Sequence, residues 1–230
     1  MRPTFIALVA IAFVAWPAPV RSQATARPCD SVEAPGPACL LAHQQLSSLP
    51  VGQVFWHLDR FRSKRAAQAA APVDSVVIDS FGSTWLFTLA RKAWRPVSGQ
   101  HVATVGPLLV PPARRYAAEY LRSIFKPGTS APLHVHSGPE AFFAVSGDTC
   151  LETPSGVRTL RGSGQGLVIE AGPPMLLMAI GRVPRRGFAL ILHDVGMPPT
   201  TLTQAWHPKA LCAREFSADQ ARNDSGYQPK

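Results

Sequence analysis

The chain has 230 residues and a formal net charge of +9 at pH 7, so it can bury one good core and still carry extensions. Its basic residues are scattered, and none of them forms a run with interleaved aromatic side chains of the sort that tracks a nucleic-acid strand. We therefore expect a basic surface and no nucleic-acid partner.

The first 24 residues have the pattern of a secretory signal peptide. Arg2 supplies the charged start, an apolar run covers 5–16, and residues 22–24 form a small-x-Ala cleavage site. The apolar run is shorter than the roughly 20 residues that a helix needs to span a bilayer. We expect maturation near Ala24, a secreted or periplasmic destination, and no integral membrane span after cleavage.

Four cysteines follow this segment, and an oxidising compartment would permit disulfides between them. Cys29 and Cys39 flank a short loop that contains proline and glycine, which favours a local bridge. Cys150 and Cys212 could pair, or could stay free and buried.

The first third of the chain mixes loop, helix and strand signals. Residues 25–50 are rich in Pro, Ala and Ser and indicate a loosely structured arm with a short helix over 38–46. A strand is predicted over 51–58, and an Ala-rich helix over 63–71 ends at Pro72.

Strands then accumulate along the chain. They are predicted over 74–81, 83–90 and 101–110, while 113–125 could begin as helix but favours a strand from 120. After Gly128, short strands alternate with Gly/Pro turns, over 133–136, 140–146, 149–153, 157–160, 167–169, 175–180 and 188–193. Regular turns between short strands indicate an all-β sandwich or barrel.

Residues 128–147 carry the most informative pattern, Gly-x5-His-x-His-x3-Glu-x6-Gly. His134 and His136, two residues apart on a strand, point to the same face. A tight turn over 137–139 would place Glu140 at the start of the antiparallel neighbour, beside both imidazoles. Two neutral imidazoles and one carboxylate can hold a divalent cation and leave positions open for water or substrate.

This spacing resembles the first motif of the cupin family, and every fixed position of that motif is filled. The second cupin motif aligns with Gly164 and Gly172, which match. Glu170 stands where proline is usual, Met175 where a fourth ligand, histidine, is usual, and Ala179 where asparagine is usual.

The resemblance implies an all-β fold, namely a single cupin-type antiparallel β-barrel (jelly roll) with N-terminal and C-terminal extensions and one or two short helices. We expect a signal peptide over 1–24, an N-terminal extension over 25–79, the barrel over 80–195 and a polar C-terminal tail over 196–230. The resemblance also implies that such barrels can form homodimers.

The expected metal ligands are His134, His136 and Glu140, and Glu140 could also act catalytically by moving a proton. They would hold one divalent transition metal, and the sequence does not choose among Fe, Mn, Ni, Zn and Cu.

Three further residues complete the expected site. Phe142 shares a strand face with Glu140 and should form the cavity wall or simply core. Met175 should form an apolar wall, with direct metal ligation at the fourth position as the alternative. His193 ends the last predicted strand and is either an auxiliary ligand or general base, or a polar cap.

These features predict a secreted or periplasmic metal-binding cupin protein. If it is an enzyme, the resemblance favours a dioxygenase over an isomerase, and an apolar cavity wall favours an apolar or aromatic small-molecule substrate. The alternative is a non-catalytic module that binds a small molecule or a structural metal.

Overall fold

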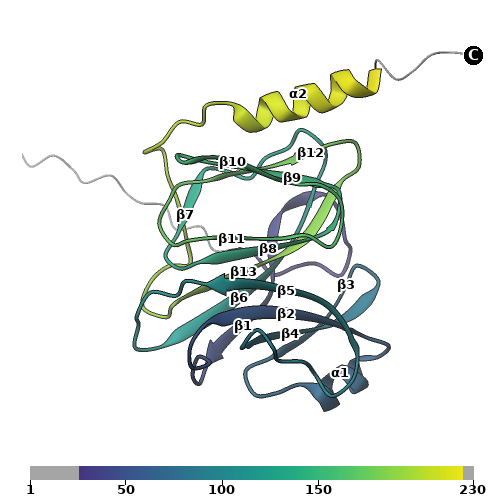
Figure 1. Ribbon diagram of the computed structural model, residues 1–230, viewed down its shortest axis with the longest axis vertical. Helices are drawn as coiled ribbons and strands as arrows, with labels where there is room; N and C mark the ends of the chain where they lie inside the picture. Colours follow the sequence, from purple (N-terminus) through teal and green to yellow (C-terminus); the bar gives the residue numbers. More distant parts are fainter. Residues whose placement is uncertain (1–25, 225–230) are drawn as a thin grey trace, which may run out of the picture.

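The computed structural model describes residues 26–224, and the predicted signal peptide lies outside these residues (Figure 1). The elements in chain order are β1 (Gly36–Leu46), β2 (Val54–Phe61), α1 (Lys64–Ala70), β3 (Val76–Ser80), β4 (Ser83–Ala90), β5 (Gln100–Leu108), β6 (Tyr116–Phe125), β7 (His134–His136), β8 (Glu140–Ser146), β9 (Asp148–Thr153), β10 (Gly156–Leu160), β11 (Gly166–Ile169), β12 (Leu176–Ile180), β13 (Arg185–Asp194), β14 (Thr200–Leu202) and α2 (Leu211–Asp224). The predicted all-β class is confirmed, with two helices in this part of the chain.

The barrel is built from antiparallel sheets that face each other. One wall is a five-stranded sheet in the order β1-β6-β13-β8-β11. The other wall combines a three-stranded sheet, β10-β9-β12, with the pair β14-β7. Single bridges from His134 to Met175 and from Ser130 to Met178 connect the chain around β7 to β12. Apolar side chains fill the interior between the walls.

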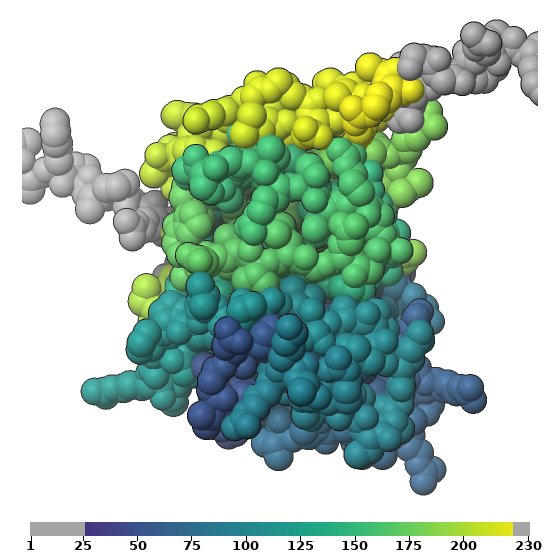
Figure 2. All heavy atoms as spheres, viewed as in Figure 1, coloured from purple at the N-terminus to yellow at the C-terminus, as the bar shows by residue number. Residues whose placement is uncertain are grey.

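A third layer covers the outside of the five-stranded wall. It is a four-stranded antiparallel sheet, β3-β4-β2-β5, and it lies below the barrel in Figure 1, where α2 lies across the opposite side. The space-filling view shows the same stacking, from the blue and teal sheet through the green barrel to the yellow helix (Figure 2). The barrel wall is therefore buried on both faces.

This double burial explains the long apolar runs of β6 and β13. Along β6, Tyr120 packs into the core between the sheets, whereas Leu121 packs into the barrel. Along β13, Leu190 and Leu192 face the core between the sheets, whereas Ile191 faces the barrel. Because strand side chains alternate between faces, a strand with two buried faces needs apolar residues at successive positions.

The N-terminal arm differs from its expectation. The helix expected over 38–46 is wrong, because β1 pairs antiparallel with β6 through most of that segment. Long-range pairing outweighs a weak local helix preference there. The Ala-rich helix is confirmed as α1, and the side chain of Ser63 caps it by accepting from the backbone N–H of Ala66 at 3.2 Å.

The strand positions also differ from the expected division of the chain. The range 80–195 includes β4 and β5, which belong to the four-stranded sheet, and leaves out β1, which forms an edge of the barrel wall. The range 196–230, expected to be a polar tail, contributes β14 to the barrel and α2 to its outer surface. No helix within residues 26–224 is both long and apolar enough to cross a membrane.

Two disulfides hold the ends of the chain against the barrel. The expected local bridge joins Cys29 to Cys39. Cys150 on β9 pairs with Cys212 at the start of α2, so the helix is tied covalently to the barrel.

Candidate metal centre

The two motif histidines lie on β7, on the interior face of the barrel. Pairing with β14 sets His136 opposite Thr200 and His134 opposite Leu202, while Met175 bridges His134 from the other side. The two rings are 4.7 Å apart between centroids. Their spacing of two residues brings both imidazoles to one face, as the sequence predicts.

Hydrogen bonds fix the tautomers of both histidines. Nδ1 of His134 lies 2.6 Å from the carbonyl oxygen of Pro132, and Nδ1 of His136 lies 3.0 Å from that of Pro199. A carbonyl only accepts, so each Nδ1 carries the proton and donates it. Both Nε2 atoms are therefore left with a free lone pair, which is the form that ligates a metal.

Glu140 completes the group from the start of β8. One ligand atom from each of His134, His136 and Glu140 lies within 4.8 Å of the others. Nε2 of His136 and Oε2 of Glu140 are 3.0 Å apart and buried, and neither has a hydrogen-bond donor among the described residues. Two acceptors facing each other in a buried site require a cation or a proton between them.

The electrostatics of the group agree with this geometry. Burial alone would lower the pKa of His136, but the nearby carboxylate of Glu140 outweighs burial and raises it. Burial, with the neighbouring His136, lowers the pKa of His134. A divalent cation would replace the proton between His136 and Glu140 and would use the lone pair of His134, so the three residues fit such an ion.

A close approach of backbones holds Glu140 in place. A Cβ atom on Gly138 would lie 1.8 Å from the carbonyl oxygen of Leu192 on β13, so this position accepts glycine alone. The backbone N–H of Leu192 also donates to the carbonyl of Pro139 at 3.1 Å. The turn between β7 and β8, expected from its sequence, is thus packed against the barrel wall.

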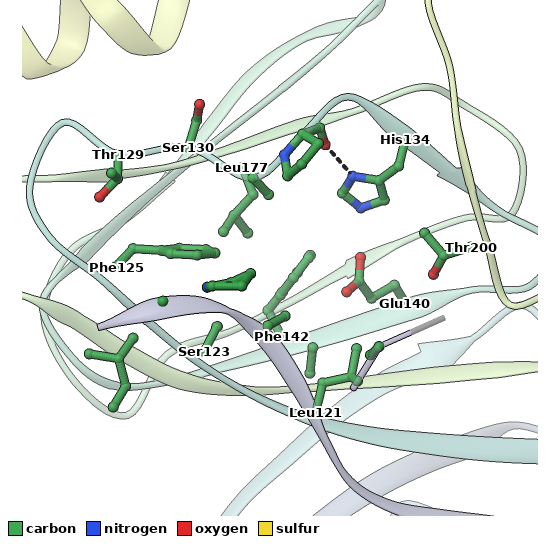
Figure 3. A pocket seen from close by; sticks show the side chains of 18 of the residues that line it. Leu121, Ser123, Phe125, Thr129, Ser130, His134, Glu140, Phe142, Leu177 and Thr200 are labelled. Atoms are coloured by element: carbon green, nitrogen blue, oxygen red, sulfur yellow. Dashed lines mark hydrogen bonds between the residues drawn. The ribbon is translucent and has the colours of Figure 1, made fainter. Parts of the chain in front are cut away.

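The group lies at one end of a cavity of about 610 Å³ inside the barrel (Figure 3). Apolar side chains dominate its wall, and they include Leu121, Phe125, Phe142 and Leu177. Residues 26–27, which precede the Cys29–Cys39 loop, and residues 35–38, which lie within it, also line the cavity. The volume falls in the range of small-molecule sites.

The remaining expected site residues lie around this group in different ways. Phe142 is in the cavity wall. Met175 is buried beside His134, packed in the barrel core, and its N–H donates to the carbonyl of His134 at 3.0 Å. His193 is buried and donates from Nδ1 to the carbonyl oxygens of Asp194 and Met197, and it is not part of the three-residue group.

Sequence reasoning missed two polar residues near the cavity. Ser123 lines the cavity, and Arg185 lies fully buried beside it. In the sequence Arg185 is one of many scattered basic residues, so nothing about it alone indicates burial. The one available signal is Gly187, a residue without a side chain two positions along the same strand.

Comparisons with protein-family models and with curated proteins find no match to this chain. Among solved structures, the chain is similar to the cupin 2 domain of an XRE family transcriptional regulator from Enterobacter cloacae, at 19% identity over 33% of this chain and 80% of that one, with a TM-score of 0.29. A cupin-like protein from Thermotoga maritima matches at 16% identity over 44% of this chain and 72% of its own, with a TM-score of 0.36.

A salicylate 1,2-dioxygenase from Pseudoaminobacter salicylatoxidans matches at 19% identity over 33% of this chain and 19% of its own, with a TM-score of 0.28. The fold assignment itself rests on the strand order and on the motif residues inside the barrel. On those grounds the barrel is of the cupin type.

Proposed function

We propose that this protein is an exported cupin-type enzyme that binds one divalent transition metal through His134, His136 and Glu140 and acts on a small organic substrate in the adjoining cavity. One observation carries the proposal. Nε2 of His136 faces Oε2 of Glu140 at 3.0 Å in a buried site that offers neither atom a donor. Such a pair is costly to bury unless a metal cation or a proton joins its members, and a divalent cation would use the lone pair of His134 as well.

The residues of the chain have separate tasks in this proposal. His134 and His136 present lone pairs whose direction is fixed by the carbonyls of Pro132 and Pro199. Glu140 supplies the negative charge and could move a proton at its carboxylate. When bound, the metal would supply Lewis-acid or redox chemistry at the positions that the protein leaves open. We favour oxygenase chemistry over isomerisation, and the apolar wall favours an apolar or aromatic substrate.

Export is part of the same proposal. The signal-like start of the sequence supports it, and so do two disulfides, which persist in oxidising compartments. N-terminal sequencing of the protein purified from whole cultures of its native host tests this part, and an intact Met1 would overturn it.

Elemental analysis tests the metal site. The mature protein, purified without chelators or a histidine tag, is compared with Glu140→Gln, which keeps the side-chain shape, and with Glu170→Gln, a matched change at an exposed glutamate. We expect about one equivalent of metal in the wild type and in Glu170→Gln, and a loss in Glu140→Gln. Folded wild-type protein that takes up none of Fe, Mn, Ni, Zn and Cu would overturn the proposal.

A non-catalytic module is the second candidate. Met175 occupies the core beside His134, so the fourth ligand position of the motif carries an apolar side chain. Oxygen uptake by the metal-loaded protein, screened with small aromatic substrates, separates the two. Bound metal without turnover of any substrate would favour the module.

A further inference from the structure

A charged side chain lies inside the barrel without a direct salt bridge among the described residues; the nearest opposing charge that acts on it is the carboxylate of Glu140. Arg185, at the start of β13, is 0% exposed and forms no ion pair with any described residue. Its Nε donates to Oγ1 of Thr149 at 3.2 Å and its Nη1 donates to Oγ of Ser123, while Nη2 has no partner. A buried, incompletely paired guanidinium is costly, so its presence needs a reason.

The fold makes room for this guanidinium beside the cavity. A Cβ atom on Gly187 would lie 2.5 Å from the carbonyl oxygen of Phe143 and 3.1 Å from Nη2 of Arg185, so a side chain there would also crowd the guanidinium. The guanidinium carbon is also 5.9 Å from the ring centroid of Phe142. Phe142 and Ser123 both line the cavity, so the positive charge lies directly behind their part of the wall.

The hydroxyl of Ser123 lies between the guanidinium of Arg185 and the cavity. Because its Oγ accepts from Arg185, its own hydroxyl proton must point elsewhere, and that proton has no acceptor among residues 26–224. Ser123 is also one of the side chains directed into the cavity in Figure 3. A hydroxyl polarised by a guanidinium is a strong donor for an anionic oxygen.

The charges around the cavity favour the same kind of ligand. Its lining includes the basic residues Arg27 and Lys126, and within the described part of the chain Glu140 is the one acidic residue. A divalent metal would more than neutralise Glu140. Burial lowers the pKa of Arg185 to about 10, which leaves the guanidinium charged at pH 7. The cavity therefore attracts anions.

Glu140 and the guanidinium of Arg185 lie beside different positions of β13, although the carboxylate still acts on the guanidinium and raises its pKa against burial. On β13, Ile191 pairs with Glu140, whereas the guanidinium lies over Gly187. At roughly 3.3 Å per residue, these two strand positions are about 13 Å apart. A molecule with an anionic group at one end and an apolar body can thus reach from Ser123 toward the metal centre along the wall formed by Leu121 and Phe142.

We propose that the hydroxyl of Ser123, held and polarised by Arg185, binds the carboxylate of the substrate, which is a small aromatic or alkyl carboxylic acid. Ser123 is the binding residue and Arg185 is a positioning residue. The identification of this ligand as the substrate rests on the proposed function, whereas the carboxylate subsite itself does not require the metal.

Isothermal titration with benzoate and benzamide tests the subsite, because the two probes have the same ring and differ in charge. We measure both in the metal-free and the zinc-loaded protein, with Ser123→Ala and, as a matched control, Ser130→Ala, a second serine that lines the cavity. We expect benzoate to bind at least about tenfold more tightly than benzamide in both metal states. Ser123→Ala should lose this preference and Ser130→Ala should keep it.

Three results would overturn the subsite. These are a benzoate preference that disappears when the metal is removed, a preference that survives Ser123→Ala, or no benzoate binding to the folded wild-type protein. The role of Arg185 is tested by Arg185→Met and Arg185→Lys, each checked for folding by circular dichroism. Lysine should restore part of the preference that methionine removes, and equal preference in the two folded variants would contradict a role for the charge.

Metal content, measured on the same preparations, separates this inference from the proposed function. Ser123→Ala should retain about one equivalent of metal. A wild-type protein that binds benzoate selectively but takes up no metal would overturn the metal centre and leave the subsite standing. A wild-type protein that takes up metal but shows no preference for benzoate would leave the metal centre standing and overturn the subsite.

Discussion

Nδ1 of His101 lies 2.8 Å from Oδ1 of the buried Asp59, in the four-stranded sheet that covers the barrel. Nε2 of His101 is 3.0 Å from Oγ1 of Thr104, which is 3.2 Å from Nδ1 of His57. This series of hydrogen bonds ends at the carbonyl oxygen of Arg91, which lies 3.0 Å from Nε2 of His57. A carbonyl only accepts, so His57 donates to it, Thr104 donates to His57, and His101 donates to Thr104. Nε2 of His101 therefore has no lone pair for the Thr104 proton, which is directed to His57 instead.

Stability should depend on pH through His57. Burial lowers the pKa of His57 from 6.5 to about 4, so between these values the unfolded chain binds a proton that the folded chain does not. The free energy of unfolding should therefore fall as pH drops from 6.5 to 4, by on the order of 3 kcal/mol.

Urea unfolding at pH 7 and pH 4.5, on the wild type and His57→Gln, measures this contribution. The wild type should lose more stability than the variant over this interval. Burial raises the pKa of Asp59, which acts with the opposite sign but is common to both proteins. Equal losses in the two proteins would contradict the role of His57.

Met175→His should strengthen metal binding. Met175, just before β12, forms a single antiparallel bridge with His134, so an imidazole there would start about 5 Å from the Cβ of His134, on the interior face. We expect the variant to hold its metal at higher chelator concentrations than the wild type. Met175→Leu, which keeps an apolar side chain of similar size, is the control and should match the wild type. A weaker hold in Met175→His would show that the barrel core does not accept the ring.

Gly138→Ala should disturb both stability and the metal site. The added methyl group would collide with the carbonyl of Leu192, so the turn between His136 and Glu140 must move. Overpacking of this kind costs roughly 1–3 kcal/mol or more. Gly196→Ala is the matched control, since its Cβ would meet its nearest neighbour at an ordinary 3.5 Å. Thermal unfolding and metal content measured together should both fall in Gly138→Ala alone, and an unchanged metal content there would argue against a rigid turn.

The two disulfides should contribute unequally to stability. The Cys150–Cys212 bridge joins residues 62 apart in sequence, and the Cys29–Cys39 bridge joins residues 10 apart. Closing a longer loop removes more freedom from the unfolded chain, so each double alanine variant should lose about 2–5 kcal/mol, with the larger loss for Cys150 and Cys212. Urea unfolding of the two variants gives the comparison, and the reverse order would contradict it.

That His134, His136 and Glu140 lie together could be predicted from sequence, because their arrangement is local. His134 and His136 are two positions apart on one strand, so their side chains point to the same face. A turn that contains Gly138 then brings the chain back to Glu140. Arg185 could not be predicted in this way. Its partners Thr149 and Ser123 are 36 and 62 residues away, and only the folded barrel brings them together.

The all-β fold class could be predicted from the sequence, but the assignment of each strand to a sheet could not. Short strands and regular turns identify an all-β chain, but nothing local in β4 or β5 indicates that these strands pair in a covering sheet instead of the barrel wall. The strand β1 was missed for a related reason, since pairing with β6 across the fold decides its conformation.

The lining of the cavity includes the first described residues of the chain. Ala26 and Arg27 line it, and the carbonyl of Arg27 accepts from the N–H of Leu40 at 2.7 Å. The three proposed metal ligands lie more than a hundred residues further along the chain. A protease that trimmed the protein past Arg27 would remove part of the cavity lining and one of its positive charges without touching any of the three proposed ligands. Such a trimmed form would keep its metal but hold an anionic substrate more weakly, so N-terminal processing could tune substrate capture separately from metal loading.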